Sequence, residues 1–364
     1  MARAHINAIA TATPPHDVHA AFCDYFGRTL PSAKERALFA RMAQRSGIAH
    51  RYSVLAPVWA GGEAVGVADG FYPPGRFPST AERMARFEAE APALATRTIA
   101  RLPIEAERER ITHLVVASCT GFVAPGLDQL IVAACGLSPA VERTLVGFMG
   151  CYAAVSALRL AHHFVRSEPA ARVLVVTLEL CTLHLQEAVG LERALAMMLF
   201  GDGCAAALVS ADEAGLALAD FRAATIADTA GAITWRIGDA GFEMRLSREV
   251  PARICEALAA ERALGDAGGL LRGREPQAFD HWAVHAGGRS ILDAVESGFG
   301  LAPCALGVSR DVLRDHGNMS SSTLMFILKR ILEANGPDAR RGEGLAMAFG
   351  PGLAAESFRF ETIS

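Results

Sequence analysis

Short, largely apolar runs alternate along this chain with longer segments whose apolar residues recur at helical spacing. The run 172–178 is typical of a strand that is buried on both faces. In the segment 320–335, Leu324, Ile327 and Leu328 fall on one face of an amphipathic helix. The pattern predicts further strands at 113–117, 144–148, 204–210, 282–285 and 344–349, and further helices at 85–102, 126–135, 151–166, 191–199, 251–264 and 289–297.

Strands and helices alternate on both sides of about residue 212. This alternation predicts an α/β protein with two similar halves, 1–212 and 213–364, that pack as layers. The 364 residues are 51% hydrophobic and 20% charged, so the chain can bury a large core.

Composition and charge exclude several classes of protein. A net charge of −4 without a long basic block argues against nucleic acid as the main partner. The longest stretch free of Asp, Glu, Lys and Arg, from Ile111 to Leu127, falls short of a membrane span, and the N-terminus has no signal-peptide pattern. The eight scattered cysteines form neither a disulfide framework nor a CxxC zinc site. We therefore expect a soluble, cytoplasmic protein with no metal site.

Cys151 is the best candidate for a nucleophile. It follows a predicted strand and a glycine, and it begins a predicted helix, where unpaired N–H groups and the helix dipole favour a thiolate. Such an elbow also exposes the sulfur. The alternative is a small buried side chain that only packs. Cys119, on a loop after a strand, could line a cavity.

Two further residues could assist a thiolate. His285 ends a predicted strand before the turn Gly287-Gly288, and its pairing with His281 in a metal site lacks a third ligand. Asn318 precedes a helix that Ser320 could cap. Its neutral amide can donate to an oxyanion, although an ordinary turn asparagine is the alternative.

Cysteine, histidine and asparagine in this order fit two chemistries. In papain-like hydrolases the histidine lies about 130–150 residues after the cysteine, a spacing that Cys151 and His285 share. That class, however, has its cysteine near the mature N-terminus in a Cys-Gly-Ser-Cys-Trp type motif, which this chain lacks. The second chemistry is the condensation of thioesters.

Six segments together resemble the chalcone-synthase-like family, the type III polyketide synthases of the thiolase superfamily. They are Ala10-Thr11-Ala12-Thr13-Pro14-Pro15, Gly150-Cys151 with Leu158-Arg159-Leu160-Ala161, Leu199-Phe200-Gly201-Asp202-Gly203, His285-Ala286-Gly287-Gly288, Gly317-Asn318-Met319-Ser320-Ser321 and Ala348-Phe349-Gly350-Pro351-Gly352. Initiating ketoacyl-ACP synthases share the three catalytic residue types, but their histidine motif reads His-Gln-Ala-Asn.

The resemblance implies a five-layer αβαβα thiolase fold and a homodimer. It also implies that Cys151 takes a starter acyl group from a CoA thioester as a thiolate paired with His285. His285 and Asn318 would then stabilise the enolate that forms as malonyl-CoA loses CO₂. Phe200 and Met244 are the expected gate between the CoA tunnel and the reaction cavity.

The resemblance further identifies residues that bind substrate. Arg41 and Arg45 match two CoA-binding positions, and Leu38 replaces the third basic residue. Ala124 stands where plant enzymes insert a methionine into the partner subunit's cavity. The other expected cavity-lining residues are Cys119, Cys181, His184, Trp235 and Ser320.

Differences from plant enzymes bear on the product. Trp235 falls where plant enzymes have a glycine, so it would fill much of the space used for a flavonoid tetraketide. We expect a bacterial-type enzyme that makes an α-pyrone, resorcinol or phloroglucinol, with fatty acyl groups among the candidate starters. No cofactor is expected beyond the CoA thioester substrates. The alternatives are an initiating 3-ketoacyl-ACP synthase, a papain-like hydrolase and a protein that only binds acyl-CoA.

Overall fold

A nine-stranded sheet forms the frame of the molecule. The computed structural model describes residues 2–66, 68, 70–73, 75–187, 190–265, 267–335 and 341–363, and within them the strand order is β13-β14-β15-β10-β1-β9-β8-β6-β7. The strands are β1 (His5–Ala12), β6 (His113–Ser118), β7 (Glu142–Gly147), β8 (Val173–Leu180), β9 (Asp202–Ser210), β10 (Gly215–Thr225), β13 (His281–Val284), β14 (Glu343–Gly350) and β15 (Ala354–Ile363).

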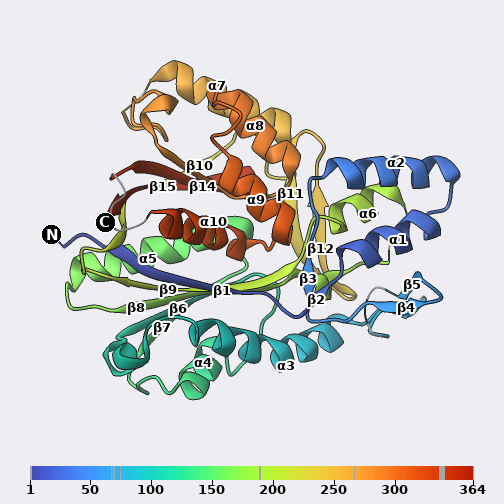
Figure 1. Ribbon diagram of the computed structural model, residues 1–364, viewed down its shortest axis with the longest axis horizontal. Coiled ribbons are helices and arrows are strands. Elements are labelled where there is room, and N and C mark those ends of the chain that lie inside the picture. Colours follow the sequence, from blue (N-terminus) through green and yellow to red (C-terminus); the bar gives the residue numbers. More distant parts are fainter. Residues whose placement is uncertain are drawn as a thin grey trace.

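This sheet is folded into two layers. β1 pairs with β10 only through His5 opposite Ala217 and Ile6 opposite Leu216, and the strands on either side of this short junction diverge (Figure 1). The expected boundary at residue 212 lies in the turn between β9 and β10. The division into two similar halves, 1–212 and 213–364, stays a prediction.

Helices complete five layers (Figure 1). α5 (Ala153–Ser167) and α10 (Ser321–Ala334) lie between the two sheet layers, α3 (Thr80–Ile99) and α4 (Leu127–Cys135) cover one outer face, and α7 (Val250–Leu264) and α8 (Arg289–Phe299) cover the other. α9 (Gly307–His316) packs beside α10. The expected αβαβα architecture is confirmed.

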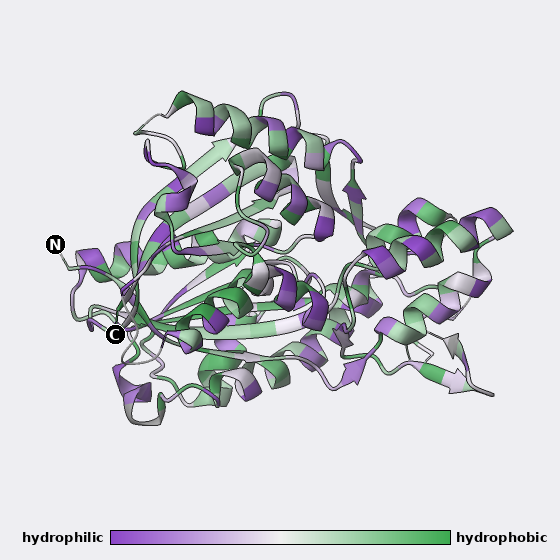
Figure 2. Ribbon diagram, turned by 45° about the horizontal axis from the view of Figure 1, so that its top comes forward, coloured by the Kyte–Doolittle hydropathy of each residue, from purple (hydrophilic) through white to green (hydrophobic). Residues whose placement is uncertain are grey.

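The predicted strands and helices are all present, with boundaries that differ by at most a few residues. α3 begins earlier than predicted because Ser79 and Glu82 form a capping box. The pattern predicts an amphipathic α10, but this is wrong for its first half. All residues from Ser321 to Leu328 are buried, because the two sheet layers enclose the helix. In Figure 2 the central strands are mostly hydrophobic, whereas the outer helices carry both kinds of residue.

A lobe beside the layers completes the walls of the cavity described below. It contains α1 (His19–Thr29), α2 (Ala33–Arg45), α6 (Leu191–Met197) and the short strands β2 (His16–Asp17), β3 (Tyr52–Ser53), β4 (Val58–Ala60) and β5 (Glu63–Gly66). The hairpin of β11 (Ile233–Gly238) and β12 (Gly241–Leu246) lies at the junction of the lobe with the layers. Arg51, just before β3, is buried in this lobe.

Candidate active site

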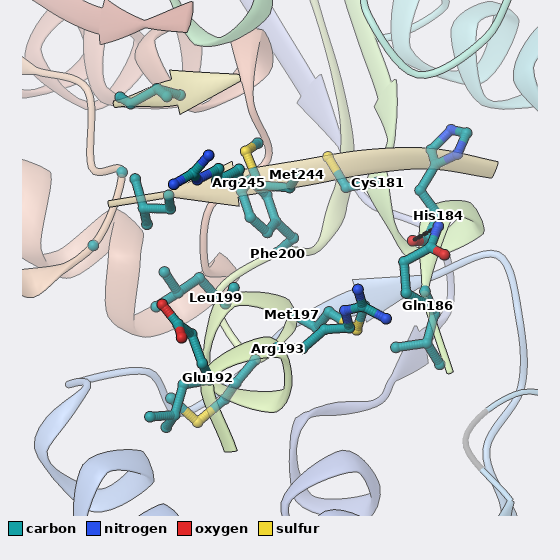
Figure 3. A pocket seen from close by; sticks show the side chains of 18 of the residues that line it. Cys181, His184, Gln186, Glu192, Arg193, Met197, Leu199, Phe200, Met244 and Arg245 are labelled. Carbon is teal, nitrogen blue, oxygen red and sulfur yellow. Dashed lines mark hydrogen bonds between the residues drawn. The ribbon is translucent and has the colours of Figure 1, made fainter. Parts of the chain in front are cut away.

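A cavity of about 1750 Å³ opens between the lobe and the layers. Cys151, Phe200, Met244, Trp235 and Ser320 line it. Figure 3 shows part of this cavity, with Phe200 and Met244 in one close view together with Cys181. The sequence therefore identifies residues from separate segments that the fold brings to one space.

Cys151 lies in a sharp turn between β7 and α5. The 3-10 turn Gly150–Tyr152 precedes α5, and Phe148 and Gly150 have φ values of 57° and 70°. A Cβ atom on Gly150 would lie 2.5 Å from the Cδ atom of Pro351, so the loop after β14 packs directly against the turn. The predicted elbow is present.

The surroundings of Cys151 disfavour a thiolate in the free protein, and the expected thiolate paired with His285 stays a prediction. Burial raises the pKa of Cys151 to about 12, and this effect outweighs the hydrogen bonds from Ser320 and Asn318, which lower it. α5 begins only at Ala153. The helix start therefore does not compensate for the loss of water around the sulfur.

Asn318 is held in one orientation by the backbone around it. Its Nδ2 atom donates to the carbonyl oxygen of Gly287 (3.1 Å), and its Oδ1 atom accepts from the N–H group of Ser320 (2.8 Å). Gly287 in turn donates from its N–H group to the carbonyl oxygen of His285 (2.9 Å). The two loops that carry Asn318 and His285 are thus linked.

His285 follows β13 directly and is 1% exposed. Within the described part of the chain, neither ring nitrogen has a hydrogen-bond partner. Burial lowers the pKa of His285 to about 3. The imidazole is therefore neutral at physiological pH, with one nitrogen able to accept a proton and the other able to donate a hydrogen bond.

Ser320 does not cap α10, although it occupies the N-cap position. Its φ of 48° is unusual for a residue other than glycine. Its hydroxyl group instead lies 3.7 Å from the sulfur of Cys151 and 3.2 Å from the sulfur of Cys119. The expectation of a helix cap is wrong, and Ser320 lies among the residues that line the cavity.

Aromatic side chains form one wall of the cavity. The indole Nε1 atom of Trp235 donates to the carbonyl oxygen of Cys119 (2.8 Å), and the ring of His184 stacks on Phe242 with centroids 4.1 Å apart. His184 contacts the carbonyl oxygen of Thr120 through Nε2 and the N–H group of Phe242 through Nδ1. These contacts fix the wall in place. Sequence reasoning did not identify Phe242.

A buried carboxylate lies behind this wall. Glu179 accepts hydrogen bonds from the N–H group of Cys119 (3.0 Å), from the Thr120 hydroxyl group (2.8 Å) and from Ser321. Burial raises the pKa of Glu179. The carboxylate joins β8 to the segments that present Cys119 and Ser320.

Both expected gate residues line the cavity, but only one of the two expected CoA-binding arginines does. Phe200 and Met244 both line the cavity, and Met244 lies opposite Trp235 in the β11–β12 hairpin. Arg45 also lines it, whereas Arg41 is exposed on α2 and is not among the lining residues. Sequence reasoning missed the other lining arginines, which lie in segments without a motif: Arg51, Arg193, Arg236, Arg245, Arg248 and Arg289.

Ala124 is exposed and does not line the cavity of its own chain. It precedes Pro125, through a cis peptide bond, near the edge of the sheet formed by β7. Its expected approach to a partner's cavity stays a prediction.

The described residues contain no group of three or more His, Cys, Asp or Glu side chains arranged to hold a metal ion. None of the helices in these ranges combines the length and the apolar character of a membrane span. Cys151 lines the cavity, whereas His285 and Asn318 are buried and are not among its lining residues. A nucleophile, a neutral imidazole and a neutral amide can support acyl transfer and can stabilise an enolate.

Known proteins are similar to this chain in sequence and in fold. The family described as chalcone and stilbene synthases matches with its N-terminal domain at residues 1–213 and with its C-terminal domain at residues 218–364. The α-pyrone synthesis polyketide synthase-like Pks18 of Mycobacterium tuberculosis is 33% identical over 98% of this chain and 91% of its own. Bisdemethoxycurcumin synthase of Oryza sativa subsp. japonica is 34% identical over 99% of this chain and 93% of its own. The crystal structure of PKS-I from the brown alga Ectocarpus siliculosus has a TM-score of 0.89 at 30% identity and covers 100% of this chain and 99% of its own.

Proposed function

The chain belongs to the chalcone and stilbene synthase family and is a type III polyketide synthase, an acyltransferase-type condensing enzyme, and from this premise we propose the role of each residue in its cavity. The observation that carries the proposal is the contact of the Cys151 sulfur with Ser320 and Asn318, together with the hydrogen bonds that join Asn318 through Gly287 to the loop of a buried His285 with unpaired ring nitrogens. The substrates are malonyl-CoA and an acyl-CoA starter, without a metal or redox cofactor.

The first half-reaction loads the starter. His285 takes the proton of the Cys151 thiol, the sulfur attacks the thioester carbonyl carbon, and the CoA thiolate leaves and receives that proton. Because burial disfavours both charges in the free enzyme, the thiolate–imidazolium pair forms only when the thioester is present.

The second half-reaction uses the same histidine as a donor. The thioester oxygen of malonyl-CoA accepts hydrogen bonds from the Asn318 amide and the His285 ring. The bond to the carboxyl group breaks, CO₂ leaves, and its electron pair forms the enolate. The enolate attacks the acyl carbon on Cys151, and the Cys151 thiolate is released. The apolar ring of Phe200 disfavours the malonyl carboxylate and so favours its loss as CO₂.

Product size follows from the walls of the cavity. Trp235 and His184 occupy space on one side, while apolar residues of the lobe, among them Phe22, Leu55 and Leu195, line the other. We propose a fatty acyl starter, a few extensions, and closure to an α-pyrone in preference to a resorcinol or phloroglucinol. The similarity to Pks18, whose name includes α-pyrone synthesis, supports this choice.

Assembly and location complete the proposal. β7 is an edge strand that carries the exposed Leu145, and the exposed side chain of Phe122 lies against Gly147 at the end of the same strand. A second copy that pairs along this edge would cover both side chains and would form a homodimer. The CoA substrates and the free cysteines agree with a cytoplasmic enzyme.

The test is incubation of the purified protein with labelled malonyl-CoA and a panel of short, long-chain and aromatic acyl-CoAs, read by mass spectrometry. We expect polyketide products in the long-chain lanes, and none with Cys151→Ala. Condensation with malonyl-ACP alone, and empty lanes with malonyl-CoA, would favour an initiating ketoacyl-ACP synthase. Hydrolysis of amides or esters without condensation would favour a hydrolase.

A further inference from the structure

Arg51 is a buried cation in the lobe, 2% exposed. Its Nε atom donates to the Nδ1 atom of His19 (3.0 Å), and its Nη1 atom donates to the carbonyl oxygens of Phe200 (2.6 Å) and Met197 (3.3 Å). Its guanidinium carbon lies 4.7 Å from the centre of the Phe22 ring. Within the described ranges these hydrogen-bond partners are neutral, and the Nη2 atom has none.

Such an environment is costly for a charge. Burial lowers the pKa of Arg51 to about 10, so the side chain still carries its charge at neutral pH. A buried cation with an unpaired donor reduces stability relative to an apolar side chain of the same shape. Buried charges that reduce stability in this way are typical of functional sites.

The side chain of Arg51 lies between two glycines of the active-site loops. A Cβ atom on Gly317 would lie 2.7 Å from the Cγ atom of Arg51, and one on Gly201 would lie 3.4 Å from its Cβ atom. Gly201 directly follows Phe200, and Gly317 directly precedes Asn318. Arg51 therefore packs against both loops at once.

These two loops are also joined to each other. The N–H group of Gly201 donates to the carbonyl oxygen of Asn318 (3.0 Å), and the N–H group of Asn318 donates to the carbonyl oxygen of Leu199 (2.8 Å). The carbonyl group of Phe200, between these bonds, points to Arg51. The guanidinium group thus holds the backbone at the place where the segment of Phe200 is hydrogen-bonded to the segment of Asn318.

We propose that Arg51 is a positioning residue for decarboxylation: through the Phe200 carbonyl group it holds the ring of Phe200 and the amide of Asn318 at their distance from the malonyl group. This inference rests on the proposed function. Cys151 lies on a different element, the turn before α5, and its sulfur is also contacted by Ser320, so we expect its intrinsic reactivity to depend on Arg51 much less than decarboxylation does.

The experiment compares Arg51→Met, which keeps the length of the side chain, with Arg51→Lys, which keeps the charge but loses the fork of donors. The matched control is Arg172→Met, because Arg172 is also buried but pairs with Glu107 and Asp212 at the end of β8 remote from the cavity. For each protein we would measure CO₂ release from labelled malonyl-CoA, the alkylation rate of Cys151 by iodoacetamide, read on its peptide by mass spectrometry, and the thermal midpoint.

For Arg51→Met we expect kcat for CO₂ release to fall about 10- to 100-fold, because a displacement of about 1 Å in positioning groups has effects of this size. KM for malonyl-CoA and the alkylation rate of Cys151 should stay within about twofold of the wild-type values, and Arg51→Lys should recover part of kcat. Arg172→Met should lower the thermal midpoint without lowering kcat.

An unchanged kcat in Arg51→Met would overturn the inference, and so would a parallel loss of kcat in Arg172→Met at an equal thermal midpoint. If Arg51→Met does not fold, kcat of Arg51→Lys is compared with that of the wild type. A lower kcat in Arg51→Lys would support the inference, and an unchanged kcat would overturn it. Absence of CO₂ release from the wild-type protein would instead overturn the proposed function itself.

Discussion

At the scale of single residues, the side chains that contact the sulfur of Cys151 are neutral. The Asn318 amide and the Ser320 hydroxyl group contact the sulfur, and His285 is buried without charge. Neutral donors held by the backbone can stabilise a negative charge as it develops, without repelling or neutralising it beforehand. The amide of Asn318 has this property because Gly287 and Ser320 fix both of its ends.

Asn318→Asp tests this property directly. A carboxylate would repel the enolate and would remove the donor, so we expect CO₂ release from malonyl-CoA to fall about 10²- to 10³-fold. Asn335→Asp, at the other end of α10, is the control and should keep the wild-type rate. An Asn318→Asp enzyme with the wild-type rate would exclude the amide as an oxyanion donor.

Trp235→Gly tests the size of the cavity. Removal of the indole opens space beside His184, so the variant should accept bulkier starters and should release longer polyketides, as read by mass spectrometry of the products. Trp235→Phe removes only the donor to Cys119 and keeps most of the volume, so its products should resemble those of the wild type. Identical product profiles for Trp235→Gly and the wild type would rule out this wall as a limit on chain length.

At the scale of elements, the turn between β7 and α5 depends on the loop after β14. Gly150 lies in the left-handed region, and Pro351 leaves no room for a side chain there. The nucleophile of the N-terminal half is therefore positioned by a segment of the C-terminal half, about 200 residues later in the chain.

Gly150→Ala should displace the turn and should lower the rate of acyl loading on Cys151 by at least about tenfold, measured by mass spectrometry of the intact protein. Gly136→Ala is the control, since Gly136 has a similar φ of 63° but no atom within 4 Å of the added Cβ position. Its cost is backbone strain alone, about 1 kcal/mol in the free energy of unfolding. Equal loading rates in the two variants would show that contact with Pro351 is unimportant.

At the scale of the whole molecule, the edge of the sheet bears on assembly. Leu145 on β7 is 47% exposed, which is unusual for a leucine on an edge strand unless another surface covers it. Leu145→Asp should convert the proposed dimer to a monomer in light scattering coupled to size-exclusion chromatography. Leu264→Asp, on the 76% exposed Leu264 of α7, should leave the dimer intact. A dimeric Leu145→Asp protein would place the interface elsewhere.

Buried histidines should make the whole fold sensitive to acid. Burial lowers the pKa of His19, His162 and His316 to about 4 and that of His184 and His285 to about 3. Between pH 6.5 and about 4, the unfolded chain takes up protons that the folded chain does not, so stability falls as the pH falls. Asp202, whose pKa burial raises to about 7, opposes this trend by a single proton.

Urea unfolding at several pH values between 7.5 and 4.5 measures this slope. His162→Phe, which keeps the packing on Phe221, should reduce the slope by about one proton, or about 1.4 kcal/mol per pH unit in the free energy of unfolding. A free energy of unfolding that stays constant across this range would contradict the prediction.

Much of the fold could be predicted from sequence because its elements have strong local patterns. The predicted strands are short apolar runs, and helices such as α7 have clear ends, with Pro251 in the first turn and the left-handed Gly265 after the last. β10, β15, α1, α2 and α9 were not predicted. In β15, for example, charged residues interrupt the apolar positions, because one part of the strand is partly exposed.

The sequence by itself determined most of the secondary structure and the likeness to a family. It also singled out Cys151, His285, Asn318 and Phe200 as candidate site residues, because these predictions depend on local pattern and contiguous motifs. The tertiary structure decided how those residues are used. It removed water from around the sulfur of Cys151, which raises the pKa of the thiol, turned Ser320 toward two sulfur atoms instead of the α10 backbone, and enclosed α10 between two sheet layers. It also brought Arg51 and the other arginines to the cavity from segments without motifs. Burial, charge compensation and close approach depend on distant segments of the chain, and so no local pattern encodes them.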